Sequence, residues 1–108
     1  MTKDTEKAFV IVYTEYLRRR SFGTAKSQAV WFEDTKLRKI DAFSGWNSDD
    51  IRCSLQELTE LGYITMDIVG NVGISKLGIQ YIERKPKEFF SAFSGAVSGI
   101  IDLVALFL

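Results

Sequence analysis

The residues best suited to acid/base chemistry in this chain are two carboxylates, Glu57 and Glu60, which fall on one side of an expected helix. Nothing around them in the sequence indicates a cleft or a raised pKa, so we interpret them as surface acids. The chain has no histidine and a single cysteine, Cys53. This composition excludes an imidazole base, the usual catalytic triads, a common zinc site and an internal disulfide. We therefore predict no enzyme, no cofactor and no metal, in a reducing intracellular setting.

Two side chains of another kind, Arg52 and Gln56, lie one helical turn apart. They are types that read base edges in DNA, arginine on guanine and glutamine on adenine. Lys36, Arg38 and Lys39 precede them in the chain and could contact backbone phosphates. The alternative for both groups is a solvated polar surface, and the sequence leaves the two interpretations open.

The net charge of the 108 residues is zero, but the charge is unevenly distributed along the chain. Residues 1–45 carry a balance of +3, residues 46–70 of −4 and residues 71–88 of +2. The acidic helix expected over residues 48–61 could contact a basic protein partner. Such a partner is the alternative to nucleic acid.

Apolar periodicity and capping residues predict four helices in the first part of the chain. They are Thr5–Arg20, a helix that Thr24 caps and that continues to about Phe32, Asp34–Phe43, and a helix that Asn47 or Ser48 caps and Gly62 ends. Strand-forming residues on either side of Gly70-Asn71 predict a β-hairpin over residues 63–74. A last helix is expected to begin after Ser75 and to stop at Pro86.

The same patterns predict which side chains are buried. In the first helix a single face is expected inside, and in the later helices one apolar stripe each. The predicted inward residues are Phe9, Val12, Tyr13, Tyr16 and Leu17, then Leu37, Ile40 and Phe43, then Ile51, Leu55, Leu58 and Leu61, and finally Leu77, Tyr81 and Ile82. Trp31 and Trp46 are expected to be core aromatics, and Cys53 to be half-buried.

Two strings, Asp50–Ile64 with its Leu-Gly-Tyr-Ile ending and Ser75–Ile82, resemble passages of winged-helix domains in order and spacing. The first resembles the end of a recognition helix and the first wing strand, and the second resembles the helix after the wing. Over residues 5–84 the chain is similar to MarR-like and PadR-like regulators. The resemblance implies a mostly α fold with a small β-hairpin wing, and a winged helix-turn-helix that sets one helix in the major groove of double-stranded DNA, commonly as a dimeric transcription regulator. The DNA contacts expected on this basis are Ser48, Arg52, Gln56, Lys36, Arg38, Lys39 and Asn71.

Residues 89–108 are the most apolar part of the chain, since fourteen of these twenty residues are apolar. As a helix the segment would be about 30 Å long, the thickness of a bilayer core. Its polar and small residues gather on one helical arc, which would let two helices approach closely. The residues expected to serve dimerisation or membrane insertion are Ser91, Gly95, Ser98, Gly99 and Asp102. Three interpretations stay open: a membrane anchor, a dimerisation helix, and a helix lying in the membrane surface.

We therefore expect a winged-helix domain over residues 1–86 and a hydrophobic C-terminal helix over residues 87–108. The expected function is DNA binding and transcription regulation by a homodimer tethered to the cytoplasmic face of a membrane, with contact to lipid through residues 89–108. The alternatives are a soluble cytoplasmic dimer that associates through the last helix, and a protein-interaction adaptor that does not bind DNA.

Overall fold

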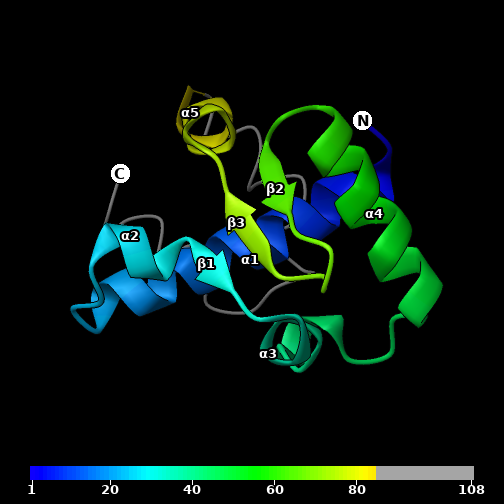
Figure 1. Cartoon of the computed structure of the whole chain (residues 1–108), viewed down its shortest axis with the longest axis horizontal. Helices are drawn as coiled ribbons and strands as arrows, with labels where there is room; N and C mark the ends of the chain where they lie inside the picture. The colour runs from blue at the N-terminus through cyan, green and yellow to red at the C-terminus, as the bar shows by residue number, and fades with distance from the viewer. Residues whose placement is uncertain (85–108) are drawn as a thin grey trace.

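A computed structural model describes residues 1–84 of the chain, and within them helices surround one small sheet (Figure 1). The elements are α1 (Lys3–Ser21), α2 (Lys26–Ala29), β1 (Trp31–Phe32), α3 (Asp34–Arg38), the 3-10 helix η1 (Asp41–Phe43), α4 (Ser48–Glu60), β2 (Ile64–Met66), β3 (Val72–Ile74) and α5 (Lys76–Arg84). The predicted fold class is confirmed at this level: the described part is mostly α, with a small antiparallel sheet.

Helix α1 is the central element of the described fold. The Thr2 hydroxyl caps it by accepting a hydrogen bond from the Thr5 backbone N–H (3.2 Å), and Gly23, with φ +90°, lies just beyond its end. The expectation of a single buried face is wrong, because every residue from Ala8 to Thr14 is buried. A helix that is apolar on all sides can be covered on all sides, and here Val10 and Ile11 extend the predicted stripe around the helix.

Helix α4 packs against α1 and is close to its predicted bounds. Asn47 caps it, since its side-chain Oδ1 accepts from the Asp49 backbone N–H (2.8 Å). Ile51, Leu55 and Leu58 are buried as predicted, but Leu61 is 41% exposed. Leu61 lies outside the core because α4 ends at Glu60. The helical spacing that buries Ile51, Leu55 and Leu58 therefore no longer applies at Leu61.

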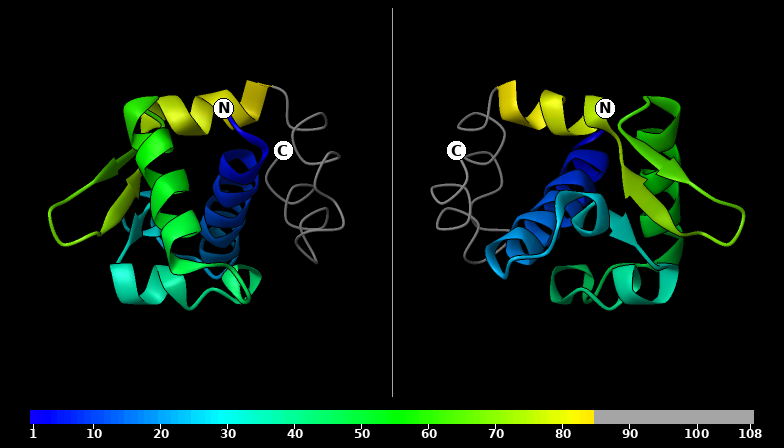
Figure 2. Two further views of the ribbon diagram at one scale, coloured as in Figure 1. Left: turned by 90° about the vertical axis from the view of Figure 1, so that its right-hand side faces the viewer. Right: turned by 60° about the vertical axis from the view of Figure 1, so that its left-hand side comes forward.

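The sheet has the strand order β1-β3-β2, and both pairs are antiparallel. The predicted hairpin is confirmed in β2 and β3, although its strands are shorter than expected and the connection covers residues 67–71. Figure 2 shows this connection projecting beyond the helices. Inside the sheet Ile64, Ile74 and Phe32 point into the core.

The predicted helix from Thr24 to Phe32 is wrong in most of its length. Ala25, not Thr24, is the N-cap of the four-residue α2, and Trp31 and Phe32 pair with β3 instead. Tertiary pairing overrides the local helical pattern, because β3 has a second edge whose backbone groups need partners. Trp31 is therefore 44% exposed rather than in the core, and its ring lies against Gly73.

The predicted helix over Asp34–Phe43 is divided in two. Ile40 adopts an extended conformation (φ −60°, ψ 129°), which separates α3 from η1. Leu37 and Phe43 are buried as expected, and Ile40 packs at the edge of the core. Trp46 is partly buried and contacts Phe43 edge-on, with ring centroids 5.3 Å apart.

Helix α5 is joined to the start of the hairpin by short contacts. Ser75 caps it as predicted: its hydroxyl accepts from the Gly78 N–H (3.0 Å) and donates to the Gly62 carbonyl (2.6 Å). Ile82 is buried and Tyr81 partly so, as expected, but Leu77 is 50% exposed. Ile79 takes the inward position, because the buried face of the helix follows Gly78 and Ile79 rather than Leu77.

Candidate nucleic-acid interface

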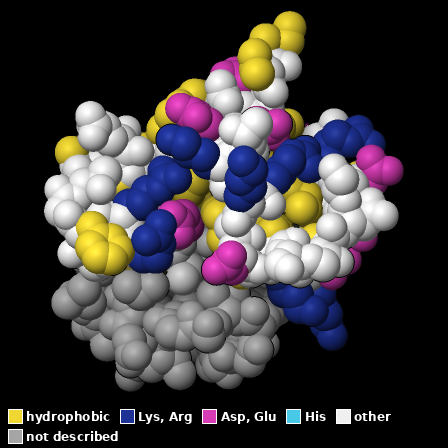
Figure 3. All heavy atoms as spheres, turned by 90° about the horizontal axis from the view of Figure 1, so that it is seen from below, with side chains coloured by type: hydrophobic (Ala, Val, Ile, Leu, Met, Phe, Trp, Pro, Cys, Tyr) yellow, Lys and Arg dark blue, Asp and Glu magenta, His cyan; other side chains and the backbone are white. Residues whose placement is uncertain are grey.

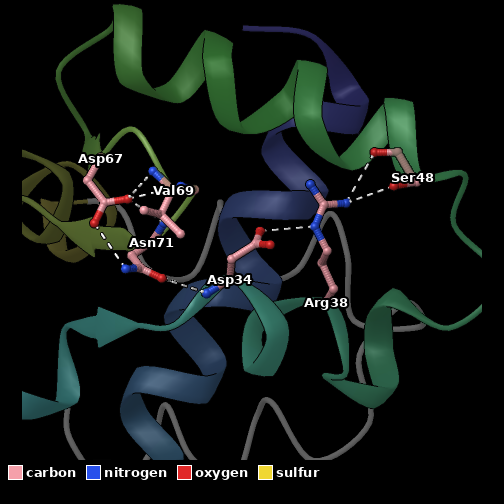
Figure 4. Close-up of polar contacts among 7 residues, drawn as sticks. Asp34, Arg38, Ser48, Asp67, Val69 and Asn71 are labelled. Carbon is pink, nitrogen blue, oxygen red and sulfur yellow. Dashed lines mark hydrogen bonds and ion pairs between the residues drawn. The ribbon is translucent and has the colours of Figure 1, made fainter.

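Arg38 on α3 and Ser48 at the start of α4 are two of the predicted DNA contacts, and the fold brings them together (Figure 4). Nη1 of Arg38 donates to the Ser48 hydroxyl oxygen (2.9 Å), and its Nε donates to Oδ1 of Asp34 (3.0 Å). Arg38 is thus held by both helices at once. The contact fixes the start of α4 relative to α3.

Asn71, a third predicted contact, is engaged between the hairpin and α3. Its Oδ1 accepts a hydrogen bond from the Asp34 backbone N–H (3.0 Å), and its Nδ2 donates to Oδ2 of Asp67 (3.0 Å). Asp34 therefore joins Asn71 on one side to Arg38 on the other, as Figure 4 shows. The resulting polar chain connects hairpin, α3 and α4.

The loop between β2 and β3 is organised around the Asp67 carboxylate. Its Oδ1 accepts from three successive backbone N–H groups, those of Val69 (3.0 Å), Gly70 (2.9 Å) and Asn71 (2.9 Å). Desolvation raises the pKa of Asp67, but the hydrogen bonds from Asn71, Val69 and Gly70 together outweigh it and lower the pKa below its ordinary value of 3.8. Gly70 has φ +102°, which the tight loop requires.

The other four predicted DNA contacts, Lys36, Lys39, Arg52 and Gln56, have exposed side chains. Lys36 forms an ion pair with Glu33 (3.8 Å) and Arg52 one with Asp49 (3.4 Å), and both cations remain more than half exposed. Such open pairs exchange readily with solvent and ligands. Figure 3 shows Lys and Arg side chains in a band across the face that carries α3.

The acidic residues of α4 divide into two groups. Asp49, Asp50 and Glu60 are exposed, with the two aspartates in the first turn, where negative charge suits the helix dipole. Glu57 instead accepts from the Thr5 hydroxyl (2.6 Å) and the Thr2 backbone N–H (3.0 Å). These hydrogen bonds, that of Thr5 first, lower the pKa of Glu57 against the opposing effect of desolvation. Glu57 therefore anchors the start of α1 and is not a free contact for a basic partner.

Four apolar residues or thiols that the sequence does not predict to be exposed lie on the surface. Ile68 and Val69, expected to be strand residues, stand at the hairpin tip with 102% and 71% of their surface exposed. Phe22 at the end of α1 is 76% exposed. Cys53, expected to be half-buried, is exposed as well, because it lies on the solvent side of α4. The alternation of apolar residues around Gly70 predicts a hairpin but does not show which of them lie in the turn.

The residues that could hold a metal are scattered in the part of the chain the structure describes. No group of three or more His, Cys, Asp or Glu side chains is placed to bind an ion there. A hollow of about 370 Å³ lies between α1 and the connection that leads into α4. It is lined by Asp4, Lys7, Ile11, Ala42, Gly45, Trp46, Asn47 and Asp50, and it contains none of the predicted DNA contacts.

The predicted dimerisation or membrane residues Ser91, Gly95, Ser98, Gly99 and Asp102 lie outside the described residues. Within residues 1–84, none of the helices has the length and apolar character needed to cross a bilayer. The expected end of the last helix at Pro86 also lies outside the described part.

No protein-family model matches the chain, and neither a curated protein nor a solved structure matches it. The class that the described residues define is therefore the coarse one, a mostly α domain with a three-stranded antiparallel sheet.

Proposed function

We propose that the chain is a winged-helix DNA-binding module and a regulator of transcription, with α4 as the recognition helix and the β2–β3 hairpin as the wing. The observation that carries the proposal is the exposure of Arg52 and Gln56, one turn apart on a helix whose opposite face is buried. Side chains of these types on one exposed helical face can reach base edges in a major groove.

The arrangement of the other elements supports the proposal. Helix α4 leads directly into the β2–β3 hairpin and α5 follows the hairpin, in the order that the winged-helix resemblance implies. Lys36 and Lys39 extend the exposed polar surface from α4 onto α3 and its end. In the proposal they contact phosphates, which position a protein on a duplex without reading its sequence.

The seven predicted contacts then have two roles. Arg38, Ser48 and Asn71 hold α3, α4 and the hairpin in register through the polar chain around Asp34. Arg52 and Gln56 contact bases, and the two lysines contact the backbone. In the proposal, the three hydrogen-bonded residues position the interface, and the four exposed residues contact the DNA.

Binding to duplex DNA at a series of salt concentrations tests the proposal. We expect affinity to fall steeply as salt rises, because cations on the protein release counterions from the phosphates. Lys36→Ala and Lys39→Ala should each weaken binding and reduce the salt slope by about 1, whereas Arg52→Ala should weaken binding mainly to a preferred sequence.

Lys76→Ala is the matched control, since Lys76 is an exposed cation on α5, on the opposite side of the domain from α3 (Figure 2). This variant should bind like the wild type. Absence of duplex binding at low salt, or equal losses for Lys36→Ala and Lys76→Ala, would refute the proposal.

A protein-interaction adaptor is the second candidate, and exposed acids on α4 favour it. Asp49 is 80% exposed in its side chain, and Asp50 and Glu60 are exposed too. A basic peptide should then bind the wild type and lose affinity with the charge reversals Asp50→Lys and Glu60→Lys. Peptide binding that ignores both reversals would count against the adaptor.

We also propose that residues 89–108 tether the module, as a homodimer, to the cytoplasmic face of a membrane. The sequence pattern of this segment, apolar over fourteen of twenty residues, supports the tether. Recovery of the full chain in membranes after alkaline carbonate, lost in Ile100→Lys, is the expected result. A chain that stays in the soluble fraction as a dimer would replace the tether by the dimerisation alternative.

A further inference from the structure

The tip of the β2–β3 hairpin presents two aliphatic side chains to solvent. Ile68 is fully exposed and Val69 largely so, and the loop that carries them projects from the body of the domain (Figure 2). Between them and Ser75 there is no Lys or Arg. The charge nearest to the pair in sequence is the carboxylate of Asp67, which is also exposed.

The loop is held in this conformation by hydrogen bonds at its base. Asp67 accepts three backbone N–H groups, and Asn71 connects the loop to the backbone of Asp34 on α3. A loop without these bonds could fold its apolar side chains back onto the domain and so reduce their exposure. The bonds keep Ile68 and Val69 outside, in a geometry suited to contact with another apolar surface.

A second exposed apolar surface lies at the far end of α1. Phe22 is 76% exposed there, and Trp31 on β1 is 44% exposed. The Arg18 guanidinium carbon lies 5.7 Å from the centroid of the Phe22 ring. Arg19 donates from Nη1 to the backbone carbonyl oxygen of Trp31 (2.6 Å), and its guanidinium lies over the neighbouring ring of Phe32. We call Phe22, Trp31, Arg18 and Arg19 the aromatic-arginine surface.

The charges of the two surfaces are opposite. Arg18, Arg19, Arg20 and Lys26 gather at the end of α1 and the start of α2, and Glu15 is the carboxylate that pairs with Arg18 and Arg19. The hairpin tip carries only Asp67. An acidic tip is repelled by phosphates, of DNA or of lipid headgroups, and fits an apolar surface edged with cations.

We propose that the hairpin tip of one copy of this chain docks on the aromatic-arginine surface of a second copy. Ile68 and Val69 cover the exposed ring of Phe22. The Asp67 carboxylate keeps its hydrogen bonds within the loop and contributes the negative charge of the tip, which complements the cations at the end of α1. The tip does not reach the aromatic-arginine surface of its own copy, because the hairpin and the α1–α2 end lie on different sides of the domain (Figures 1 and 2).

Such a contact joins two different surfaces, so it is head to tail rather than two-fold symmetric. Each added copy leaves one free tip and one free aromatic-arginine surface at the ends, and growth continues unless the rotation between copies closes a ring. The proposal is independent of DNA binding, since it uses neither Arg52 nor Gln56.

Light scattering of the full chain over a range of protein concentrations tests the contact. The mean mass of the wild type should rise with concentration beyond the level that the variants Ile68→Ser/Val69→Ser and Phe22→Ser reach. Leu77→Ser is the matched control, because Leu77 is also half exposed but lies on α5 outside both surfaces, and it should behave like the wild type. Circular dichroism establishes that each variant is folded. Association through residues 89–108 is common to all variants and cancels in the comparison.

Mixing the two variants gives the decisive result. The tip variant keeps an intact aromatic-arginine surface and Phe22→Ser keeps an intact tip, so an equimolar mixture should regain the tip-to-surface contact and a part of the mass that each variant alone has lost. Failure of the mixture to regain mass overturns the proposal. So does a tip variant that associates like the wild type, or one whose only loss is binding to duplex DNA or to phosphatidylglycerol vesicles.

Discussion

The β2–β3 hairpin and the outer face of α3 and α4 use similar polar residues in opposite ways. At the hairpin, Asp67, Asn71 and Asp34 direct their hydrogen bonds toward one another. On the outer face of the helices, Arg52 and Gln56 direct their polar groups to solvent. We refer to the hairpin, with its contacts to α3 and α5, as the closed region, and to the outer face as the open region.

This difference separates stability from binding. In the closed region a lost side chain leaves backbone groups without their partners, which costs free energy of unfolding. In the open region water replaces a lost partner at little cost. Substitutions in the closed region should therefore change stability first, whereas those in the open region should change only the affinity for a ligand.

The largest effect is expected at Gly78, where α5 meets the start of the hairpin. A Cβ at this position would lie 2.1 Å from the backbone carbonyl oxygen of Tyr63, so Gly78→Ala forces the helix away from the hairpin. We expect a loss of about 3 kcal/mol in the free energy of unfolding, because overpacking outweighs the better helix propensity of alanine. Urea denaturation measures it. Gln80→Ala, an exposed position on the same helix, is the control, and equal stability of the two variants would contradict the assignment.

A smaller loss is expected when the hairpin is disconnected from α3. Asn71→Ala removes the acceptor of the Asp34 N–H and a donor to Asp67, and should cost about 1 to 2 kcal/mol. Gln56→Ala removes an exposed amide from the open region and should cost almost nothing. If the two substitutions have equal effects in urea denaturation, the distinction between the regions fails.

The closed region should also be sensitive to acid. The pKa of Asp67 lies below its ordinary value of 3.8 in the folded chain, so its contribution to stability is complete above that value and is lost as the pH falls through the lowered pKa. Asp67→Asn lacks this titration, so its stability should fall less steeply than that of the wild type below about pH 4. Glu57 adds the same sign of dependence in both proteins. Parallel stability curves for the two proteins would show that the carboxylate is not the group responsible.

The sequence predicts the closed region less well than the helix that carries the open one. Asn47 followed by the Ile51, Leu55 and Leu58 stripe is a local signal, and α4 follows it closely. Asp34, which joins Asn71 to α3, lies 37 residues from it in sequence, and the partners of Glu57 on α1 and its cap lie 52 and 55 residues away. No periodicity reports such contacts, so Asn71 reads as a candidate for binding DNA and Glu57 as a surface acid.

Trp31 shows a second limit of prediction from sequence. Its neighbours favour a helix, and an isolated two-residue strand has no pattern of its own. Strand β1 forms because β3 has an unpaired edge. It also needs a glycine at position 73, since a Cβ there would lie only 3.3 Å from the Trp31 indole. Such a strand can be predicted only once the position of the hairpin is known, because its pairing with β3 determines it.

A small effect on stability, and the sharpest test of the comparison, is expected at Arg52. Its ion pair with Asp49 is long (3.4 Å) and both side chains are mostly exposed, so Arg52→Ala should change the free energy of unfolding by no more than about 0.5 kcal/mol. The same substitution removes a bidentate donor for guanine, and should reduce affinity for a preferred duplex by about 1 to 3 kcal/mol.

Arg38→Ala should have the opposite effect, because the Arg38 guanidinium donates hydrogen bonds to Ser48 and Asp34. We expect the free energy of unfolding to fall, and any loss of affinity for DNA to follow from displacement of α4. Denaturation and duplex binding of the two variants, measured side by side, therefore separate an arginine that shapes the interface from one that binds. Loss of stability without loss of affinity in Arg52→Ala would place Arg52 in the closed region and remove it from the proposed interface.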